Sequence, residues 1–241
     1  MFDSGRDQAA GLRGLFEARP MLFLGLGCTS ADPRDRDGAT ALAHALQRAG
    51  RRPMVIDLLG DDAGPGACGS RSRHASRRAA IARVEAHRLL DPDADSRDLA
   101  ALARSLREHA LQCGSDADIA LVIADPLRLA DVAAALTDRM VLIAPGDAAS
   151  LARLYAQLKA VRLAHGMTRF VAAFRDARSS QAILAAHRRL SETAARFLGA
   201  AVEFGGVLPS GEQDLHAWDR LAAAAIDWAR PLDVAHAAVP N

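Results

Sequence analysis

The sequence predicts one doubly wound, mostly parallel α/β sheet, and two observations support this fold class. Short β-branched runs alternate with runs rich in Ala, Leu and Arg, which is typical of strands and helices that alternate around a parallel sheet. The run Ile119–Ile123 is apolar at every position, as expected of a parallel strand covered on both faces. The 241 residues suffice for one sizeable domain and are too few for two ordinary enzymatic domains.

The strands are predicted from short runs of β-branched and other apolar residues bounded by turn residues. They are expected at residues 21–26, 53–58, 119–124, 139–144, 169–174 and 202–208. The helices are predicted where apolar residues recur every three or four positions. They are expected at residues 4–18, 38–48, 76–112 (in two pieces, broken at 91–96), 127–136, 149–165, 180–198 and 213–229. Residues 60–75 are rich in Gly, Ser and Arg and predict a loop.

Composition excludes several classes of protein. Thirty basic and twenty-nine acidic residues give a net charge of +1, so no overall field attracts nucleic acid or a membrane. No apolar run approaches the length that spans a bilayer, and the first twenty residues lack the apolar core of a signal peptide. Three cysteines and eight histidines are scattered without disulfide or zinc-ligand spacing. We therefore expect a cytoplasmic protein without a metal site.

The loop after the first strand is where a doubly wound sheet binds its ligand. Gly38, Ala39 and Thr40 stand where a phosphate-binding loop would have Gly-Lys-Thr, so the threonine is present and the lysine is replaced by alanine. The only lysine of the chain is Lys159. The loop also carries three aspartates, whose charge opposes that of a nucleotide, at positions 32, 35 and 37. No Ser/His/Asp or Cys/His arrangement stands out, and we predict no catalytic residue.

Several stretches carry a resemblance that covers nearly the whole chain. They are residues 41–50, 54–57, 138–151, 196–199 and 204–209. In these stretches the chain resembles the MinD/ParA-type P-loop ATPases. The resemblance implies that Asp57 is the first acidic residue of the family's nucleotide site, whereas Leu59 stands where the family has a second acidic residue. Ala124 stands where the family has its switch aspartate, and Asp125 follows one position later. The position that reads the adenine base falls on Phe174 or Arg175.

The N-terminal residues Asp7-Gln8-Ala9-Ala10-Gly11-Leu12-Arg13 carry a more specific resemblance. They look like the D-Q-A-x-x-L-R segment of the flagellar number regulators FlhG (also called FleN). The resemblance implies that this segment engages and stimulates the signal-recognition-type GTPase FlhF through Asp7, Gln8, Ala9, Leu12 and Arg13. It also implies a flagellar transcriptional activator as a second partner, and recruitment by a partner to the cell pole or inner membrane.

Together these features predict a degenerate FlhG-like protein that acts by protein contact and has lost its ATPase. The nucleotide site keeps Gly38, Ala39, Thr40, Asp57 and Asp125 without the lysine, so we expect no cofactor. An alternative is an ATP-dependent switch that binds ATP and magnesium through a phosphate site rebuilt around positions Arg34, Arg36 or Lys159. A ParA-type accessory protein of another secretion or polysaccharide system is a third hypothesis.

Each of these features also has a purely structural interpretation. Residues 7–13 are compatible with an ordinary helix start, and Asp57 and Asp125 with helix capping or pairing to arginine. The arginines between residues 71 and 88 fit a solvated helix face better than a nucleic-acid site, because no aromatic residue is interleaved. Charges cancel on the helix predicted at 213–229, so we expect it to pack on the domain and membrane association to be weak or absent.

The chain is therefore divided into three parts. Residues 1–20 are expected to form a partner-activating segment, residues 21–212 a degenerate MinD/ParA-like domain, and residues 213–241 a C-terminal helix and tail.

Overall fold

The computed structural model of the protein describes residues 21–29, 33–59, 81–85, 117–133, 137, 139–175, 179–209 and 215–231. The strands are β1 (Leu22–Cys28), β2 (Pro53–Asp57), β3 (Ala82–Glu85), β4 (Ile119–Ala124), β5 (Arg139–Pro145), β6 (Arg169–Arg175), β7 (Ala201–Leu208) and β8 (Arg230–Pro231). The helices are α2 (Pro33–Arg48), α4 (Pro126–Ala133), α5 (Ala148–His165), α6 (Ser180–Leu198) and α7 (Leu215–Trp228). Within these ranges, no helix is long and apolar enough to cross a membrane.

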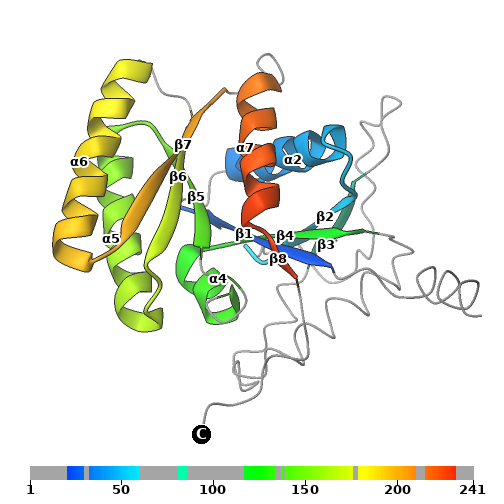
Figure 1. Ribbon diagram of the computed structural model, residues 1–241, viewed down its shortest axis with the longest axis horizontal. Coiled ribbons are helices and arrows are strands. Elements are labelled where there is room, and N and C mark those ends of the chain that lie inside the picture. Colours follow the sequence, from blue (N-terminus) through cyan, green and yellow to red (C-terminus); the bar gives the residue numbers. More distant parts are fainter. Residues whose placement is uncertain are drawn as a thin grey trace, which may run out of the picture.

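The strands form one sheet in the order β3-β2-β4-β1-β5-β6-β7 (Figure 1). All neighbouring pairs in this order are parallel; β1 and β4, for example, pair from Leu22 opposite Ile119 to Gly27 opposite Ala124. The short strand β8 runs antiparallel to the start of β1. The predicted fold class, a doubly wound and mostly parallel sheet, is confirmed.

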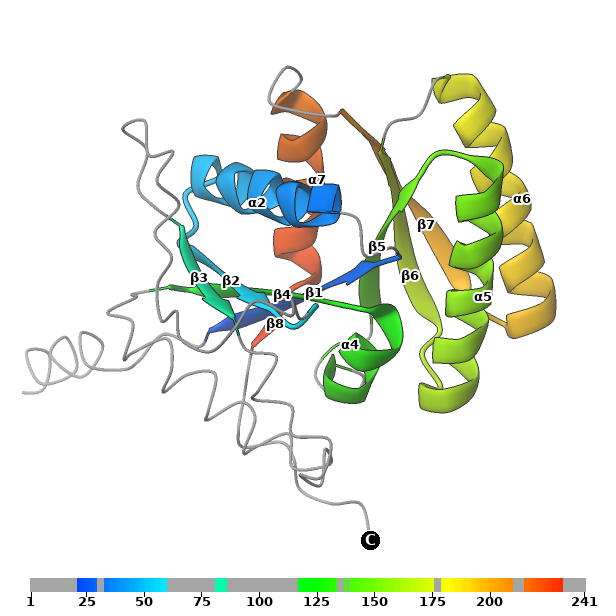
Figure 2. The ribbon, with the colours of Figure 1, turned by 180° about the vertical axis from the view of Figure 1, so that it is seen from behind.

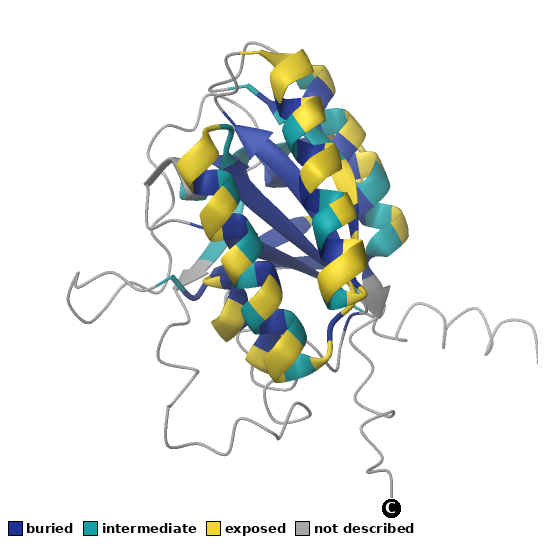
Figure 3. Cartoon of the chain, turned by 90° about the vertical axis from the view of Figure 1, so that its left-hand side faces the viewer, coloured by how far each residue is buried: buried dark blue, intermediate teal, exposed yellow. Residues whose placement is uncertain are grey.

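Helices cover both faces of the sheet (Figures 1 and 2). Helices α2 and α7 pack on one face, and α4, α5 and α6 pack on the other. The strand β4 is apolar throughout because both of its faces are buried. Leu121 belongs to the core under α2 and α7, and Val122 belongs to the core under the other three helices. In Figure 3 the strands in the middle of the sheet are dark blue, and the outward faces of the helices are largely yellow.

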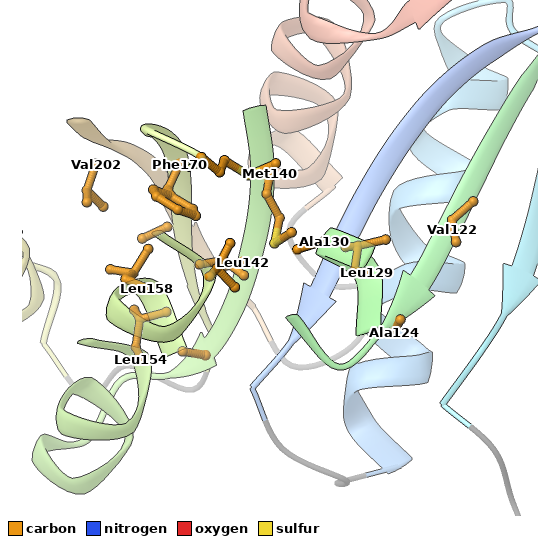
Figure 4. Packing of buried hydrophobic residues seen from close by; sticks show 14 of the residues in the cluster. Val122, Ala124, Leu129, Ala130, Met140, Leu142, Leu154, Leu158, Phe170 and Val202 are labelled. Atoms are coloured by element: carbon orange, nitrogen blue, oxygen red, sulfur yellow. The ribbon is translucent and has the colours of Figure 1, made fainter. Parts of the chain in front are cut away.

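The core under α4, α5 and α6 is filled from both sides. Figure 4 shows Met140 and Leu142 of β5 lying between Leu129 of α4 and Leu158 of α5. All four side chains are at most 1% exposed. This burial of apolar area, worth about 25 cal/mol per Å², holds these helices against the sheet.

The two long helices of this layer have well-defined ends. At the start of α5, Asp147 accepts a hydrogen bond from the backbone N–H of Ser150 at 2.9 Å. At the start of α6, the Ser179 hydroxyl accepts a hydrogen bond from the backbone N–H of Ala182 at 3.3 Å. At their C-terminal ends, Gly166 and Gly199 adopt φ values of 70° and 58°, which glycine adopts without steric cost. These caps explain why the sequence places both helices correctly.

Two predicted elements are wrong. Residues 82–85 form the strand β3, where a helix over 76–112 was predicted. Local Ala and Arg content favours a helix there, but pairing of this segment with residues 54–57 of β2 fixes it as a strand. The helix α2 begins at Pro33 and not at Gly38, and Pro33 stands at the first helical position, where proline is favoured.

Candidate functional site

The candidate site lies at the carboxyl ends of the central strands, where a doubly wound sheet binds ligands. The neighbouring strands β2, β4 and β1 end there at Asp57, Ala124 and Cys28. Helix α2 follows β1 and packs on α7 and on the adjoining strands. The site therefore brings together the start of α2, the ends of three strands and the first turn of α4.

The early start of α2 changes the role of the glycine-threonine stretch. Because the helix begins at Pro33, Gly38, Ala39 and Thr40 lie in its second turn, where their backbone N–H groups donate to carbonyls four residues earlier. The Thr40 hydroxyl donates to the carbonyl of Arg36 at 2.9 Å. The donors that would bind phosphate in a loop are thus used within the helix.

The side of α2 that carries Gly38 and Ala39 is packed. Ala39 is completely buried, and a Cβ atom at Gly38 would lie 3.4 Å from Cη2 of Trp218 in α7 and 3.6 Å from Cδ1 of Ile143 in β5. These are ordinary van der Waals distances, so the packing of α7 on α2 does not require glycine at position 38.

The glycines of β1 also have a packing role. A Cβ atom at Gly27 would lie 2.5 Å from Cδ2 of Leu142 and 3.2 Å from Cγ of Pro126, and one at Gly25 would lie 3.3 Å from Cδ2 of Leu129. A residue larger than glycine at position 27 requires the core to shift. Gly27 belongs to β1, which extends two residues beyond the predicted strand.

Asp57 is the centre of a charged cluster that joins three elements. Its side chain lies at the end of β2, and the residue is 4% exposed. The carboxylate atom Oδ2 accepts a hydrogen bond from Nε of Arg36 in α2 at 2.9 Å and another from Nη2 of Arg83 in β3. The other oxygen, Oδ1, accepts from the backbone N–H of Leu59 at 3.0 Å. We call Arg36, Asp57 and Arg83 the Asp57 cluster.

The cluster keeps Asp57 ionised. Burial by itself would raise the pKa of this carboxyl, but the hydrogen bond from Arg83, the backbone hydrogen bond from Leu59 and the bond from Arg36 outweigh it, so the pKa lies below its ordinary value of 3.8. Two guanidinium groups share one carboxylate, so the cluster has an excess of one positive charge. Helix α2, β2 and the edge strand β3 are thereby linked.

Asp125, the other carboxylate predicted for the site, caps a helix. It is exposed at the start of α4, and its Oδ1 accepts a hydrogen bond from the backbone N–H of Leu127 at 2.9 Å. Asp57 thus pairs with arginine and Asp125 caps a helix, which are the roles that the purely structural interpretation of these two residues expects. Among the described residues, no three His, Cys, Asp or Glu side chains gather closely enough to hold a metal ion.

Two of the basic residues considered for a rebuilt phosphate site, Arg36 and Lys159, do not come together. Arg36 is in the Asp57 cluster, whereas Lys159 lies exposed on α5, which packs on the opposite face of the sheet from α2. Position 34 belongs to α2, but its side chain lies outside the described residues. Of the arginines between residues 71 and 88, only Arg83 is described, and it contacts Asp57.

The position implied to read a base is part of the core. Phe174 is completely buried and stacks on Phe204 with ring centroids 6.0 Å apart. Its ring also forms a T-shaped pair with His187, with centroids 6.2 Å apart. The following residue, Arg175, is 5% exposed. The predicted partner-binding residues Asp7, Gln8, Ala9, Leu12 and Arg13 lie outside the described residues.

Sequence reasoning missed the role of Arg83. It was grouped with neighbouring arginines on a predicted helix, although residues 82–85 alternate between apolar and charged side chains in a way that also fits a short strand. The signal was too short to separate the two interpretations. Only the pairing of β3 with β2 brings Arg83 to the end of β2.

Comparison with known proteins identifies the fold. No protein-family model and no curated protein matches this sequence. Among solved structures, the chain is similar to a ParA protein, pNOB8 ParA bound to nonspecific DNA, with 10% identity, a TM-score of 0.53, and coverage of 86% of this chain and 98% of that one. It is also similar to a plasmid partition protein from Borrelia burgdorferi, with 9% identity, a TM-score of 0.51, and coverage of 87% and 99%. The chain therefore has the MinD/ParA-like α/β fold.

Proposed function

We propose that this protein is a regulator of flagellum number or placement that acts by protein contact, without ATP hydrolysis. Its MinD/ParA-like domain serves as a scaffold, and the segment Asp7–Arg13 stimulates the flagellar GTPase FlhF. A flagellar transcriptional activator is a second proposed partner, and recruitment to the cell pole or inner membrane would occur through a partner. The segment Asp7–Arg13 supports the flagellar part of this proposal through its resemblance to the FlhG family.

The observation that carries the loss of ATPase activity is the geometry of α2. Gly38, Ala39 and Thr40 lie inside the helix, so their N–H groups are not presented to a phosphate. A phosphate-binding loop also needs a lysine for the β- and γ-phosphates, and residue 39 is a buried alanine. A nucleotide would have to unwind the first turns of α2 to gain these donors.

The Asp57 cluster supports the same conclusion. A carboxylate that helps to position magnesium must be available to the ion or its water shell. Here the carboxylate of Asp57 is buried and holds Arg36 and Arg83, so magnesium would have to displace two guanidinium groups. We infer that Arg36 and Arg83 supply beside Asp57 the positive charge that a bound magnesium ion would supply, and that they hold α2 against β2 in the absence of nucleotide.

The proposal predicts that the protein stimulates GTP turnover by FlhF in the absence of ATP. Combined substitution of Gln8→Ala and Arg13→Ala should reduce turnover to the rate of FlhF alone, because these changes remove the two longest polar side chains of the segment. The measurement is phosphate release at fixed FlhF concentration, with and without this protein.

The matched control is Arg6→Ala, which removes an arginine from the same stretch but outside the D-Q-A-x-x-L-R pattern, and it should leave stimulation unchanged. Equal stimulation by the double variant and the original protein would contradict the role of the segment. Absence of stimulation by the original protein, with or without ATP, would contradict the flagellar proposal, whereas the assignment of the fold would stand.

A second experiment addresses the alternative of an ATP-dependent switch. We expect titration with ATP and magnesium to give no binding heat in a calorimeter, because each lost phosphate contact is worth about 1–3 kcal/mol and several are missing together. Tight binding that is lost in Arg36→Ala and kept in Arg48→Ala would establish the alternative. Arg48 is a suitable control because it lies on the same helix and pairs with Asp219 at 2.5 Å.

A further inference from the structure

Two neighbouring helices carry a concentration of positive charge that the net charge of the chain conceals. Helices α5 and α6 lie side by side at the end of the sheet away from β3 (Figures 1 and 2). Together they contain one carboxylate, Glu192, and six cationic side chains: Arg153, Lys159, Arg162, Arg188, Arg189 and Arg196. On the opposite face, the four arginines of α2 and α7 are matched by four aspartates. The α5–α6 layer is therefore a distinct basic surface.

None of these six cations forms an ion pair with a carboxylate of the described residues. Arg153 differs from the other five, because it donates to Oγ of Ser150 at 2.9 Å and its charge helps to lower the pKa of the neighbouring Asp147 carboxyl. Five of the six, Arg153, Lys159, Arg188, Arg189 and Arg196, are exposed, and Arg162 is half-buried. A surface of one sign raises the local concentration of oppositely charged partners.

The same surface exposes large apolar side chains. Leu163 is 72% exposed and Phe197 is 66% exposed, the highest values for large apolar residues in the described part of the chain. Each lies in the last turn of its helix, and Nε of Arg162 donates to the carbonyl of Leu198 at 3.0 Å, which joins the two helix ends. The guanidinium of Arg196 lies 5.2 Å from the centre of the Phe197 ring.

We propose that the C-terminal ends of α5 and α6 form a docking surface for an anionic phospholipid bilayer. Leu163 and Phe197 enter the boundary between headgroups and acyl chains. Five of the cations face lipid phosphates, and Arg153, which lies near the start of α5, does not. Apolar side chains next to Lys and Arg are the combination that holds a protein at a membrane surface. Long arginine and lysine side chains can reach the headgroups while their stems stay against apolar atoms.

The arrangement of the apolar residues favours lipid over other anionic partners. A DNA backbone offers nothing to an exposed leucine, and the Phe197 ring is in contact with Arg196, so it does not present a free stacking platform. A partner helix would need an apolar stripe along α5 or α6, but the outward positions between the helix ends include charged residues such as Lys159 and Arg188. The two most exposed large apolar side chains, Leu163 and Phe197, instead lie where the two helices end, whereas Leu184 in the first half of α6 is 41% exposed.

This surface is separate from the C-terminal helix, on which the expectation of weak or absent membrane association was based. Helix α7 buries Trp218 and Leu221 in the core, and its charges do not favour a membrane. A contact through two apolar side chains and five cations is expected to be weak and sensitive to salt. The inference does not depend on the flagellar role.

The test is sedimentation of the full-length protein with vesicles of equal parts phosphatidylglycerol and phosphatidylcholine, compared with vesicles of phosphatidylcholine alone. We expect binding to the mixed vesicles at low salt, loss of binding at high salt, and little binding to phosphatidylcholine. The double variant Leu163→Ser/Phe197→Ser should weaken binding about tenfold or more, because it removes the side chains that enter the bilayer.

Charge and fold are controlled separately. Arg188→Gln/Arg189→Gln should weaken binding, whereas Arg220→Gln on α7 and Leu127→Ser on α4 should not, although they remove exposed side chains of the same kinds. Phe197→Trp should bind at least as well as the original protein, since tryptophan favours the membrane interface. The proposal is overturned if the mixed vesicles do not bind, if the double serine variant binds equally, or if the surface binds duplex DNA and not vesicles.

Discussion

Substitution of Asp57 by alanine is expected to lower the free energy of unfolding by about 2–4 kcal/mol. Removal of one partner from a buried ion pair typically costs about 3–5 kcal/mol, because the remaining charge is left without compensation. Here Arg36 and Arg83 keep side-chain exposures of 20% and 29%, so water recovers part of that loss. The variant should also weaken the edge of the sheet, since Arg83 is the side chain that ties β3 to the end of β2.

The contribution of Asp57 should depend on pH in a defined direction. Its folded-state pKa is below the ordinary value of 3.8, so the folded state favours the ionised carboxylate. The stabilisation is fully present above the unfolded pKa and is lost as pH falls through the folded pKa. The stability difference between the original protein and Asp57→Ala should therefore be constant near neutral pH and shrink below about pH 4.

Urea unfolding at a series of pH values measures both effects. The matched control is Asp37→Ala, an exposed aspartate on α2, which should change stability by no more than about 0.5 kcal/mol. Hydrogen exchange at residues 82–85 should speed up in Asp57→Ala and stay unchanged in the control. A stability loss equal to that of Asp37→Ala, or one that does not shrink in acid, would show that the Asp57 cluster does not hold these elements together.

The sequence predicts most of the sheet because buried parallel strands have an unambiguous pattern. The strand 119–124 is found as predicted, and the strands at 139 and 169 extend one residue beyond their predicted ends. Apart from arginines at strand ends, at positions 139, 169 and 175, every residue in these strands is apolar, and both faces are covered. Periodicity in α6, together with the Ser179 and Gly199 caps, locates the helix at 180–198 for equally local reasons.

The two errors in the fold arise where tertiary contacts decide. The stretch from Pro33 to Asp37 has four charged residues in a row after the proline, and this composition predicts a loop. A helix is nevertheless permitted, because proline is favoured at the first helical position and apolar residues follow. In β3, four residues in a stretch whose composition favours a helix form a strand because they pair with β2. Neither outcome follows from a local window.

The candidate site shows the same limit. The sequence identifies Asp57 and Asp125 as carboxylates at strand ends, which is a statement about topology. It does not reveal that Arg36 and Arg83 converge on Asp57, because the three residues are separated by 21 and 26 positions and meet only through the sheet. The resemblance to a phosphate loop also hides the helical state of Gly38, since glycine is compatible with both.

Substitution of Trp218 by alanine is the second large effect that we expect, with a loss of about 3–5 kcal/mol in the free energy of unfolding. Trp218 is 4% exposed and packs in the core between α7 and α2, where its ring faces Gly38. Its Nε1 atom is buried and has no hydrogen-bond partner among the described residues. Trp218→Phe removes that donor and keeps a ring, so we expect it to cost less than about 1.5 kcal/mol.

The substitution Gly38→Ala distinguishes a glycine in a helix from a glycine in a phosphate-binding loop. In a helix, alanine is favoured over glycine by about 0.8–1 kcal/mol, and the added Cβ would make ordinary contacts at 3.4 Å with Trp218 and 3.6 Å with Ile143. We therefore expect Gly38→Ala to leave stability unchanged or to raise it by up to about 1 kcal/mol in urea unfolding. A loss of more than about 1 kcal/mol would mean that Gly38 adopts a backbone conformation that only glycine allows. Since α2 would then not be helical at this position, that result would reopen the interpretation of residues 38–40 as a loop that can bind phosphate.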